Sequence, residues 1–402
     1  MTDGEGGGAG RGGVQGRGAG QGRRGGPARG RGAEVTARDV ARRVLDRVEK
    51  GAWATLALDG ELTRSGLEDR DRRLASELIY GVLRNRLRID RALAAHAELK
   101  RTPPRVVTAL RIAVYQLLFL DRVPGYAAVD DAVHAARAVG GPKLAGFCNA
   151  VLRKLTTSGE PALPAPSRER IEVEHSLPRW IADELAAAST ERFEHVAAAL
   201  ARPAPLVARA NRLRTTREGL MERFRAEGVT VSPVAGGETG AEMALALEGL
   251  GDPAKSGTFN AGLWTVQDTG AQIVGAMASP SAGQRILDAC AGVGGKSTHL
   301  AELSDDASPI DAADQLKTKL HLAEATARRL GITSVKPQLC DLLDPAAPLS
   351  SAYDLIVLDA PCSGLGVLRR HPDAKWRLKP DDVPRLAALQ RQLLDAVVPR
   401  LA

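Results

Sequence analysis

Four short strand-like runs in the last third of the chain, each ended or followed by an aspartate, constrain the fold most. They lie at 285–289, 310–313, 335–339 and 355–358, and a glycine loop or helical patterns occur between them. The last run is four consecutive apolar residues, which is typical of a strand covered on both faces. Strands that alternate with helices predict one half of a doubly wound parallel sheet. We therefore expect a Rossmann-like but incomplete α/β domain over residues 256–402.

The first part of the chain carries a different pattern. From residue 34 to residue 155 apolar residues recur four positions apart, as at Val40 and Val44, and this period marks one face of a helix. The pattern predicts an all-α bundle over residues 34–158. Between this bundle and the α/β domain, residues 159–255 are expected to form a linker and a small α/β subdomain. The expected fold class is therefore α plus α/β, in several domains.

Residues 1–33 form a tail with 15 glycines, six arginines and no aromatic residue. This composition cannot bury enough apolar surface to offset the entropy of ordering, so we expect the tail to be disordered. It is either a solubilising leader without a specific role or an arm that raises affinity for RNA through phosphate contacts.

Composition and cysteine spacing narrow the class of protein. The 402 residues carry a net charge of +7, which favours a polyanionic partner, whereas 3% aromatic residues disfavour broad stacking platforms. No window of eighteen consecutive apolar residues and no apolar leader occur, so we expect a cytoplasmic protein without membrane spans. The four widely spaced cysteines fit neither a disulfide framework nor a metal site: Cys148, Cys290, Cys340 and Cys362.

A glycine loop follows the first strand-like run and is the first candidate binding site: Cys290, Ala291, Gly292, Val293, Gly294, Gly295 and Lys296. It is not a P-loop, which needs glycine in place of Cys290, nor a dinucleotide fingerprint, which needs glycine in place of Ser297. Asp314, at the end of the second run, can accept both ribose hydroxyls of an adenosine. Asp341, after the third run, can take the adenine amino group. Loop and acids together fit S-adenosylmethionine better than a nucleotide.

The second candidate site is the segment 359–364, Asp-Ala-Pro-Cys-Ser-Gly, directly after the last run. Carbon-5 of cytosine accepts a methyl group only after a thiolate has added to carbon-6, so a cysteine beside a methyl-donor pocket suggests pyrimidine chemistry. Cys362 and Asp359 are therefore the candidate catalytic residues, with Asp359 holding the base and bordering the cofactor. The basic residues that follow either hold phosphates or belong to a solvated loop: Arg369, Arg370, Lys375 and Arg377.

These motifs resemble the Sun/Nop family of RNA cytosine-C5 methyltransferases. The resemblance is carried by four segments of the catalytic part: 265–268, 287–296, 359–364 and 370–376. The helical region resembles the RNA-binding NusB fold through segments 77–84 and 147–154, and this combination is that of the RsmB-like enzymes. The resemblance implies S-adenosylmethionine-dependent methylation of a cytosine in small-subunit (16S) ribosomal RNA through a covalent cysteine–carbon-6 adduct. We expect a monomer that binds ribosomal RNA, with no metal and no membrane contact.

Two departures from the family pattern bear on activity. Val293 stands where the family loop usually has proline, and no Thr-Cys pair occurs in the 402 residues. The resemblance implies that Cys362, in the Pro-Cys motif, assists release of the product. It also implies that the attacking cysteine belongs to a Thr-Cys motif at the end of a fifth strand. We therefore expect that the chain ends before that strand, and that strands five to seven of the sheet are missing.

Two alternatives to the methyltransferase reading stay open. One is a catalytically inactive, NusB-like RNA-binding protein that uses the helical region alone. The other is a DNA cytosine methyltransferase with Cys362 as its nucleophile, which the NusB-like region disfavours.

Overall fold

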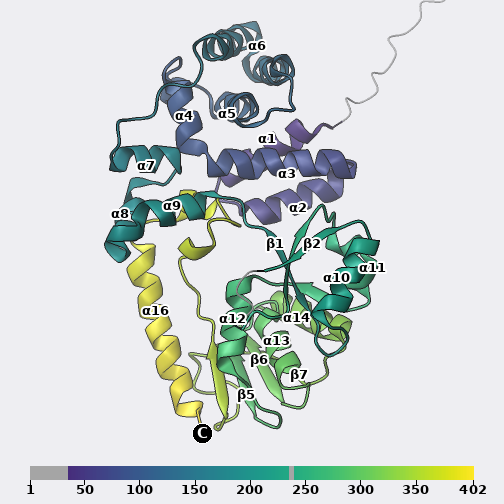
Figure 1. Ribbon diagram of the computed structural model, residues 1–402. Coiled ribbons are helices and arrows are strands. Elements are labelled where there is room, and N and C mark those ends of the chain that lie inside the picture. The colour runs from purple at the N-terminus through teal and green to yellow at the C-terminus, as the bar shows by residue number, and fades with distance from the viewer. Residues whose placement is uncertain (1–34, 235–239) are drawn as a thin grey trace, which may run out of the picture. The chain divides into compact units, whose positions relative to one another are not determined.

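The computed structural model of the chain describes residues 35–234 and 240–402 (Figure 1). The tail expected to be disordered, residues 1–33, lies outside the described residues. Within the described ranges, no helix is long and apolar enough to cross a membrane. In the same ranges, no group of histidine, cysteine, aspartate and glutamate side chains has the arrangement of a metal site.

Residues 35–158 contain helices and no strand, as the periodicity predicts. Apart from a short 3-10 turn at Leu99–Arg101, the helices are α1 (Ala37–Val48), α2 (Ala54–Ser65), α3 (Asp69–Arg84), α4 (Arg86–Ala94), α5 (Pro104–Phe119) and α6 (Gly125–Ser158). Thr36 is the N-cap of α1, and its hydroxyl accepts the N–H of Asp39 at 3.1 Å. Helix α6 is interrupted at Gly140 and Gly141, whose backbone angles are not helical. The apolar stripe of α1 is buried, with Val40 fully so.

Three helices and an antiparallel sheet follow the bundle. The helices are α7 (Arg168–Glu174), α8 (Arg179–Ala188) and α9 (Phe193–Ala201). The sheet has the order β2-β3-β1-β4, with strands β1 (Leu206–Ala210), β2 (Thr230–Pro233), β3 (Ala244–Glu248) and β4 (Trp264–Val266). Helices α10 (Arg217–Ala226) and α11 (Gly257–Asn260) accompany it, and Leu220, Phe224 and Trp264 form its core. Strand β4 extends this sheet beyond residue 255, where the sequence analysis ends the subdomain.

A parallel sheet occupies the last third of the described chain, and it confirms the α plus α/β fold class. Its order is β7-β6-β5-β8, with strands β5 (Ile286–Ala289), β6 (Ile310–Asp314), β7 (Val335–Leu339) and β8 (Leu355–Leu358). Its helices are α12 (Thr269–Ala278), α13 (Gly295–Leu303), α14 (Lys317–Leu330), α15 (Ala374–Arg377) and α16 (Asp382–Val397). Side chains of α13 and α14 pack on one face of the sheet, and those of α16 pack on the other. Successive residues of β5, Ile286 and Leu287, point to these two faces.

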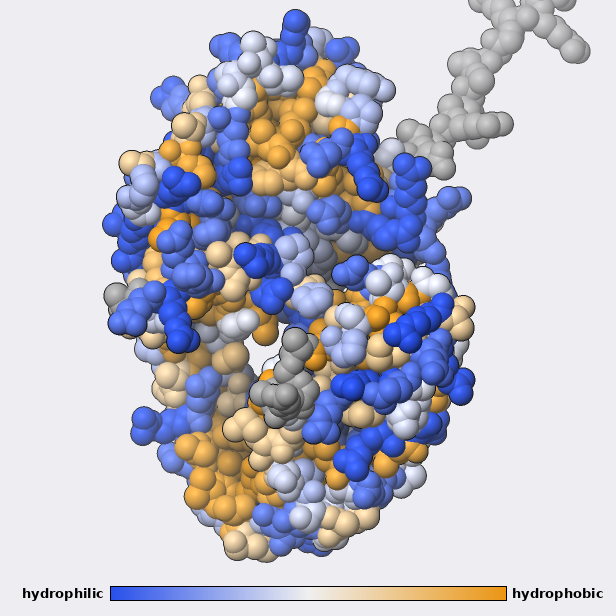
Figure 2. Space-filling view, in the orientation of Figure 1, coloured by the Kyte–Doolittle hydropathy of each residue, from blue (hydrophilic) through white to orange (hydrophobic). Residues whose placement is uncertain are grey.

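Strand β8 lies at one edge of the sheet, although four consecutive apolar residues are typical of a strand covered on both faces. Its four residues are half-buried rather than covered on both faces, because β8 is an outer strand of the sheet and pairs with β5. Nearby, Leu394, Val398 and Leu401 are at least half exposed. Figure 2 shows apolar surface around the C-terminal end of α16. The apolar residues of β8 thus fit a strand of a parallel sheet, but the described residues cover their side chains only in part.

The segment after β8 joins the catalytic part of the chain to the helical bundle. Asp373 Oδ2 accepts the N–H of Ala54 at 3.0 Å, at the start of α2. Lys375 Nζ donates to the carbonyl of Arg84 at 2.9 Å, and Trp376 Nε1 donates to the carbonyl of Leu83 at 2.7 Å, at the end of α3. A motif that the family resemblance assigns to the catalytic domain therefore holds the end of a bundle helix.

These contacts bear on the two readings of the basic residues in this segment. Lys375 is only 4% exposed, which excludes a solvated loop at that position. Arg370 pairs with Asp268, and the guanidinium of Arg377 lies over the ring of Trp53 at 3.8 Å from its centroid. Burial, together with the nearby charge of Arg84, lowers the pKa of Lys375 to about 7. The main contacts of Arg370, Lys375 and Arg377 are thus with other parts of the protein.

The pKa of Lys375 predicts a pH dependence of stability. Between about pH 7 and pH 10 the unfolded chain holds a proton on this lysine that the folded chain has released. The free energy of unfolding therefore rises with pH in this window, with a slope of about 1 kcal/mol per pH unit. In Lys375→Met the rise should flatten. Urea denaturation at about pH 7.5 and about pH 9.5 measures it, and an equal pH slope in both proteins would contradict the assignment.

Candidate active site

The carboxyl edge of the parallel sheet borders a cavity of about 440 Å³. Residues at the ends of all four strands line it, together with two leucines of α16, Leu389 and Leu393. Among its lining residues are six that the sequence predicts: Cys290, Gly292, Asp314, Asp341, Asp359 and Cys362. Five predicted loop residues lie outside its lining: Ala291, Val293, Gly294, Gly295 and Lys296. The structure thus brings the three acids and the Pro-Cys cysteine together with the glycine loop.

The glycine loop makes a sharp turn between β5 and α13. Its backbone is left-handed at Cys290 (φ 65°), Gly292 (φ 59°) and Gly294 (φ 80°). A Cβ at position 294 would lie 2.8 Å from the Cβ of Ala323 on α14, so close packing and backbone conformation both require glycine there. Gly294 is also the N-cap of α13. The loop is therefore pressed against α14, while Gly292 faces the cavity.

Two of the acids organise the backbone around the cavity. Asp314 is 7% exposed, and its two oxygens accept the N–H groups of Gly292 at 3.0 Å and of Leu316 at 2.8 Å. Asp341 is exposed, and its Oδ1 accepts the N–H of Leu343 at 3.0 Å. Since each carboxylate oxygen has two lone pairs, both side chains retain acceptor capacity toward the cavity.

Asp359 lies between the 440 Å³ cavity and a second one. Its Oδ2 is 2.5 Å from Lys296 Nζ, and both residues line a cavity of about 670 Å³ that also includes Arg369 and Arg370. Lys296 therefore contacts the side of Asp359 that faces this second cavity. The carboxylate is available to molecules in either space.

The four cysteines differ in accessibility. Burial raises the pKa of Cys148 to about 12 and that of Cys290 to about 11, and it also raises the pKa of Cys340. These three thiols are protonated at neutral pH, and a thiol is a far weaker nucleophile than a thiolate. Cys362 is the exposed cysteine of the four. It is the thiol best placed for reaction with a molecule that enters from solvent.

Sequence reasoning did not select Asp288, although it lies in the motif before the loop. Its side chain is fully buried in β5, and burial raises its pKa to about 6. Ser297 Oγ donates to its Oδ2 at 2.5 Å, and no described residue donates to its Oδ1. The signal that could have selected it is an acid within an apolar strand, since buried carboxylates are rare without a function or a partner.

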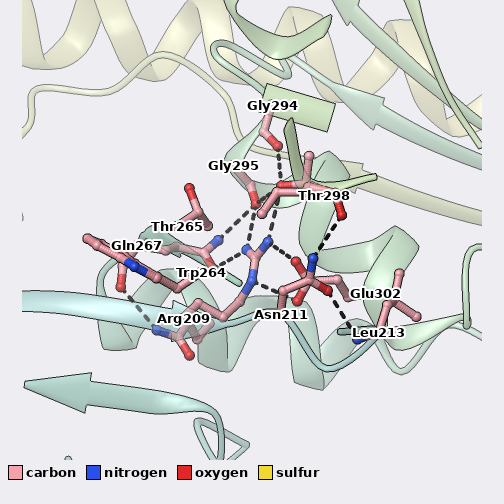
Figure 3. A network of polar contacts seen from close by, with 12 residues as sticks. Arg209, Asn211, Leu213, Trp264, Thr265, Gln267, Gly294, Gly295, Thr298 and Glu302 are labelled. Atoms are coloured by element: carbon pink, nitrogen blue, oxygen red, sulfur yellow. Dashed lines mark hydrogen bonds and ion pairs between the residues drawn. The ribbon is translucent and has the colours of Figure 1, made fainter. Parts of the chain in front are cut away.

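Arg209 of β1 is a second residue that the sequence analysis missed, and it contacts the glycine loop on the side away from the 440 Å³ cavity (Figure 3). Its Nε and Nη2 donate to the carboxylate of Glu302 at 3.2 and 2.6 Å. Its Nη1 donates to Gln267 Oε1 at 2.5 Å and to the carbonyl of Gly295 at 3.0 Å. Nη2 also donates to Thr298 Oγ1 at 3.2 Å. One guanidinium therefore ties the antiparallel sheet to the first turns of α13.

Gln267 completes this network. Its Nε2 donates to the same carbonyl of Gly295, at 3.0 Å. Arg209 is 0% exposed and Glu302 is 1% exposed. Burial raises the pKa of Glu302 above its ordinary value. The neighbouring cation of Arg209 lowers this pKa, but its effect is smaller than that of burial. Because a buried charge is tolerated only when it is paired and hydrogen-bonded, each partner depends on the other.

The network predicts a large loss of stability when one partner is removed. In Arg209→Met the carboxylate of Glu302 is left buried without its cation, so the free energy of unfolding should fall by about 3–5 kcal/mol. The double variant Arg209→Met with Glu302→Leu should recover much of that loss. Urea denaturation of the three proteins measures the effect. A single variant within about 0.5 kcal/mol of the wild type would show that the pair contributes little.

Comparison with family models places this geometry among known proteins. Residues 276–402 match the model of the 16S rRNA methyltransferase RsmB/F family. Residues 35–157 match the NusB family. Residues 177–248 match the ferredoxin-like domain of RsmF/B-like methyltransferases. The NusB match covers the helical bundle, the ferredoxin-like match covers α8, α9 and most of the antiparallel sheet, and the methyltransferase match covers the parallel sheet.

Similar proteins agree with the family models. A Bacillus subtilis protein named probable ribosomal RNA small subunit methyltransferase B is 33% identical over 91% of this chain and 82% of its own length. Ribosomal RNA small subunit methyltransferase B of Pseudomonas putida is 33% identical over 90% of this chain and 82% of its own length. The solved structure of PH0851 shares the fold, with a TM-score of 0.73, 23% identity, and coverage of 92% of this chain and 84% of that one.

These matches confirm the resemblance that the sequence motifs carry. Identity near one third extends across the helical bundle, the antiparallel sheet and the parallel sheet, so it does not rest on one motif. The chain belongs to the RsmB family of small-subunit ribosomal RNA methyltransferases.

Proposed function

We propose that the protein binds S-adenosylmethionine in the 440 Å³ cavity and serves the methylation of carbon-5 of a cytosine in 16S ribosomal RNA. Membership of a ribosomal RNA methyltransferase family supports methyl transfer to RNA. One observation carries the finer proposal: Gly292, Asp314, Asp341, Asp359 and Cys362 line a single cavity. A methyl donor and a pyrimidine need these groups side by side.

The cavity suits the cofactor in volume and in donor set. Its volume of about 440 Å³ is within the usual range of about 300–1,000 Å³ for small-molecule sites. Asp314 is assigned to the ribose hydroxyls and Asp341 to the adenine amino group, and Leu342 and Leu393 offer apolar contacts for the adenine ring. When bound, the cofactor supplies an electrophilic methyl group on a sulfonium. Of the glycine loop 290–296, the two residues that line the cavity, Cys290 and Gly292, are assigned to the methionine end through their backbone.

Asp359 and Cys362 are assigned to the base. The carboxylate of Asp359, held by Lys296 at 2.5 Å, accepts a hydrogen bond from the cytosine amino group or the ring nitrogen. Addition of a thiolate to carbon-6 raises the electron density on carbon-5. After transfer, loss of the carbon-5 proton restores the ring and expels the thiolate. Cys362 is assigned to this release step, by the family pattern.

The ribose assignment of Asp314 predicts a loss of cofactor affinity. Asp314→Ala should weaken S-adenosylmethionine binding by about 1–3 kcal/mol, because hydrogen bonds to a charged acceptor are lost. Asp314→Asn, which keeps the volume, should weaken it less. Calorimetry measures the affinity. Asp344→Ala is the matched control, since Asp344 also accepts a backbone N–H, that of Ala346, outside the cavity. Equal affinity in Asp314→Ala and the control would reject the assignment.

The role of Cys362 is tested by tritiated-methyl transfer to fragments of 16S ribosomal RNA. As a release residue, Cys362 does not itself attack carbon-6, and the sequence has no Thr-Cys pair to do so. The 402-residue chain should therefore bind the cofactor and RNA without transferring methyl groups. Carbon-5 methylation by this chain that is lost in Cys362→Ala but kept in Cys148→Ala would make Cys362 the nucleophile instead.

A further inference from the structure

A groove runs from helix α3 to the candidate catalytic residues. Besides the 670 Å³ cavity beside Asp359, the described residues include a cavity of about 720 Å³ along α3. The two share Ala204, Arg369 and Arg370 in their linings, so they adjoin at these residues. We name the two cavities together the α3 groove. Its far end lies on α3 and its near end reaches Lys296 and Asp359.

The far half of the α3 groove carries excess positive charge. Four of its arginines take part in no ion pair among the described side chains: Arg72, Arg73, Arg84 and Arg369. Its acids are fewer: Asp69, Glu77 and Asp252. Lys255 pairs with Asp69. Figure 2 shows hydrophilic surface over α2 and α3. The charge is therefore available to an anion that lies in the groove.

Two of these arginines are held in place by hydrogen bonds to backbone carbonyls. Arg369 donates to the carbonyls of Arg202 and Pro203, at 3.4 and 3.0 Å. Arg84 donates through Nη2 to the carbonyl of Arg369 at 3.3 Å, and its Nε is buried with no hydrogen-bond partner in the described part of the chain. Carbonyl oxygens orient a guanidinium but do not neutralise it. The groove thus presents preorganised cations.

We propose that the α3 groove binds the phosphate backbone of the RNA strand whose base reaches Asp359. This inference rests on the proposed function, because the near end of the groove is the site assigned to the base. Tyr80 is the one phenylalanine, tyrosine or tryptophan among the described residues that line the groove. The groove therefore recognises RNA by charge rather than by base stacking. The contacts in the 720 Å³ cavity along α3 do not depend on the base sequence of the RNA. An RNA strand is favoured over an acidic protein by the continuity of the groove with the base site.

Arg73 gives the sharpest test, because it is exposed and makes no ion pair. Arg73→Gln should weaken binding of a 16S ribosomal RNA fragment by the full chain about tenfold, the cost of one charged hydrogen bond. It should also reduce the slope of log affinity against log salt by about 0.7, the value for one phosphate contact on a single strand. Arg137→Gln is the matched control: Arg137 on α6 is exposed and lies outside the groove.

Fluorescence anisotropy over a salt series measures both quantities, and calorimetry with S-adenosylmethionine separates this inference from the proposed function. The proposal is supported if both variants keep the cofactor affinity of the wild type and only Arg73→Gln binds RNA more weakly. Equal RNA affinity and salt slope in the Arg73 and Arg137 variants would overturn it, whatever the cofactor result. Absence of cofactor binding by the wild type would instead reject the proposed function. Photo-cross-links from 4-thiouridine RNA should fall on residues 69–84 and 203–205, and cross-links confined to other segments would also overturn the groove.

Discussion

The buried pair of Arg209 and Glu302 is the interaction on which the rest of the site depends. Five hydrogen bonds use the nitrogens of one guanidinium: two to Glu302 and one each to Gln267, Gly295 and Thr298. A charged side chain in the core is stable only when its donors are used in this way. The pair also positions the start of α13, because the side chains of Arg209 and Gln267 both donate to the carbonyl of Gly295.

This positioning explains why an antiparallel sheet lies next to the catalytic sheet. The glycine loop has left-handed backbone at three positions and is pressed against α14 at Gly294. Such a loop holds its shape when both sides are fixed. Asp314 fixes the cavity side through the N–H of Gly292, and Arg209 and Gln267 fix the other side. Preorganisation of this kind lowers the cost of binding a ligand.

The parts of the fold that the sequence predicts are those with a strong local signal. The bounds of β5, β6, β7 and β8 differ from the expected runs by one residue at most, because short apolar runs that end in acids are distinctive. Strands β3 and β4 and helices α7–α9 were not predicted, since three to ten residues of mixed polarity carry little periodicity. The cavity at the sheet edge is lined by Asp314, Asp341, Asp359 and Cys362, because the ends of parallel strands meet at one edge.

The residues that the sequence does not reveal act over long separations. Arg209 is a lone arginine in a strand, and its partner Glu302 is 93 positions away. In the sequence Lys375 resembles an exposed cation of a loop. In the structure it is buried, and its Nζ donates to the carbonyl of Arg84 at the end of α3, 291 positions earlier. Neither contact has a local pattern. Only the packing of the helical bundle and the two sheets determines them.

Hydrogen–deuterium exchange with and without S-adenosylmethionine tests the central claim most directly, namely that the cavity at the carboxyl edge of the parallel sheet is the cofactor site. The account predicts slower exchange on addition of the cofactor in the glycine loop 290–296 and after β6 and β7, at 314–320 and 340–343. Segments remote from the cavity, such as α5, should not change. Unchanged exchange at the glycine loop, or protection centred on another part of the chain, would contradict the account.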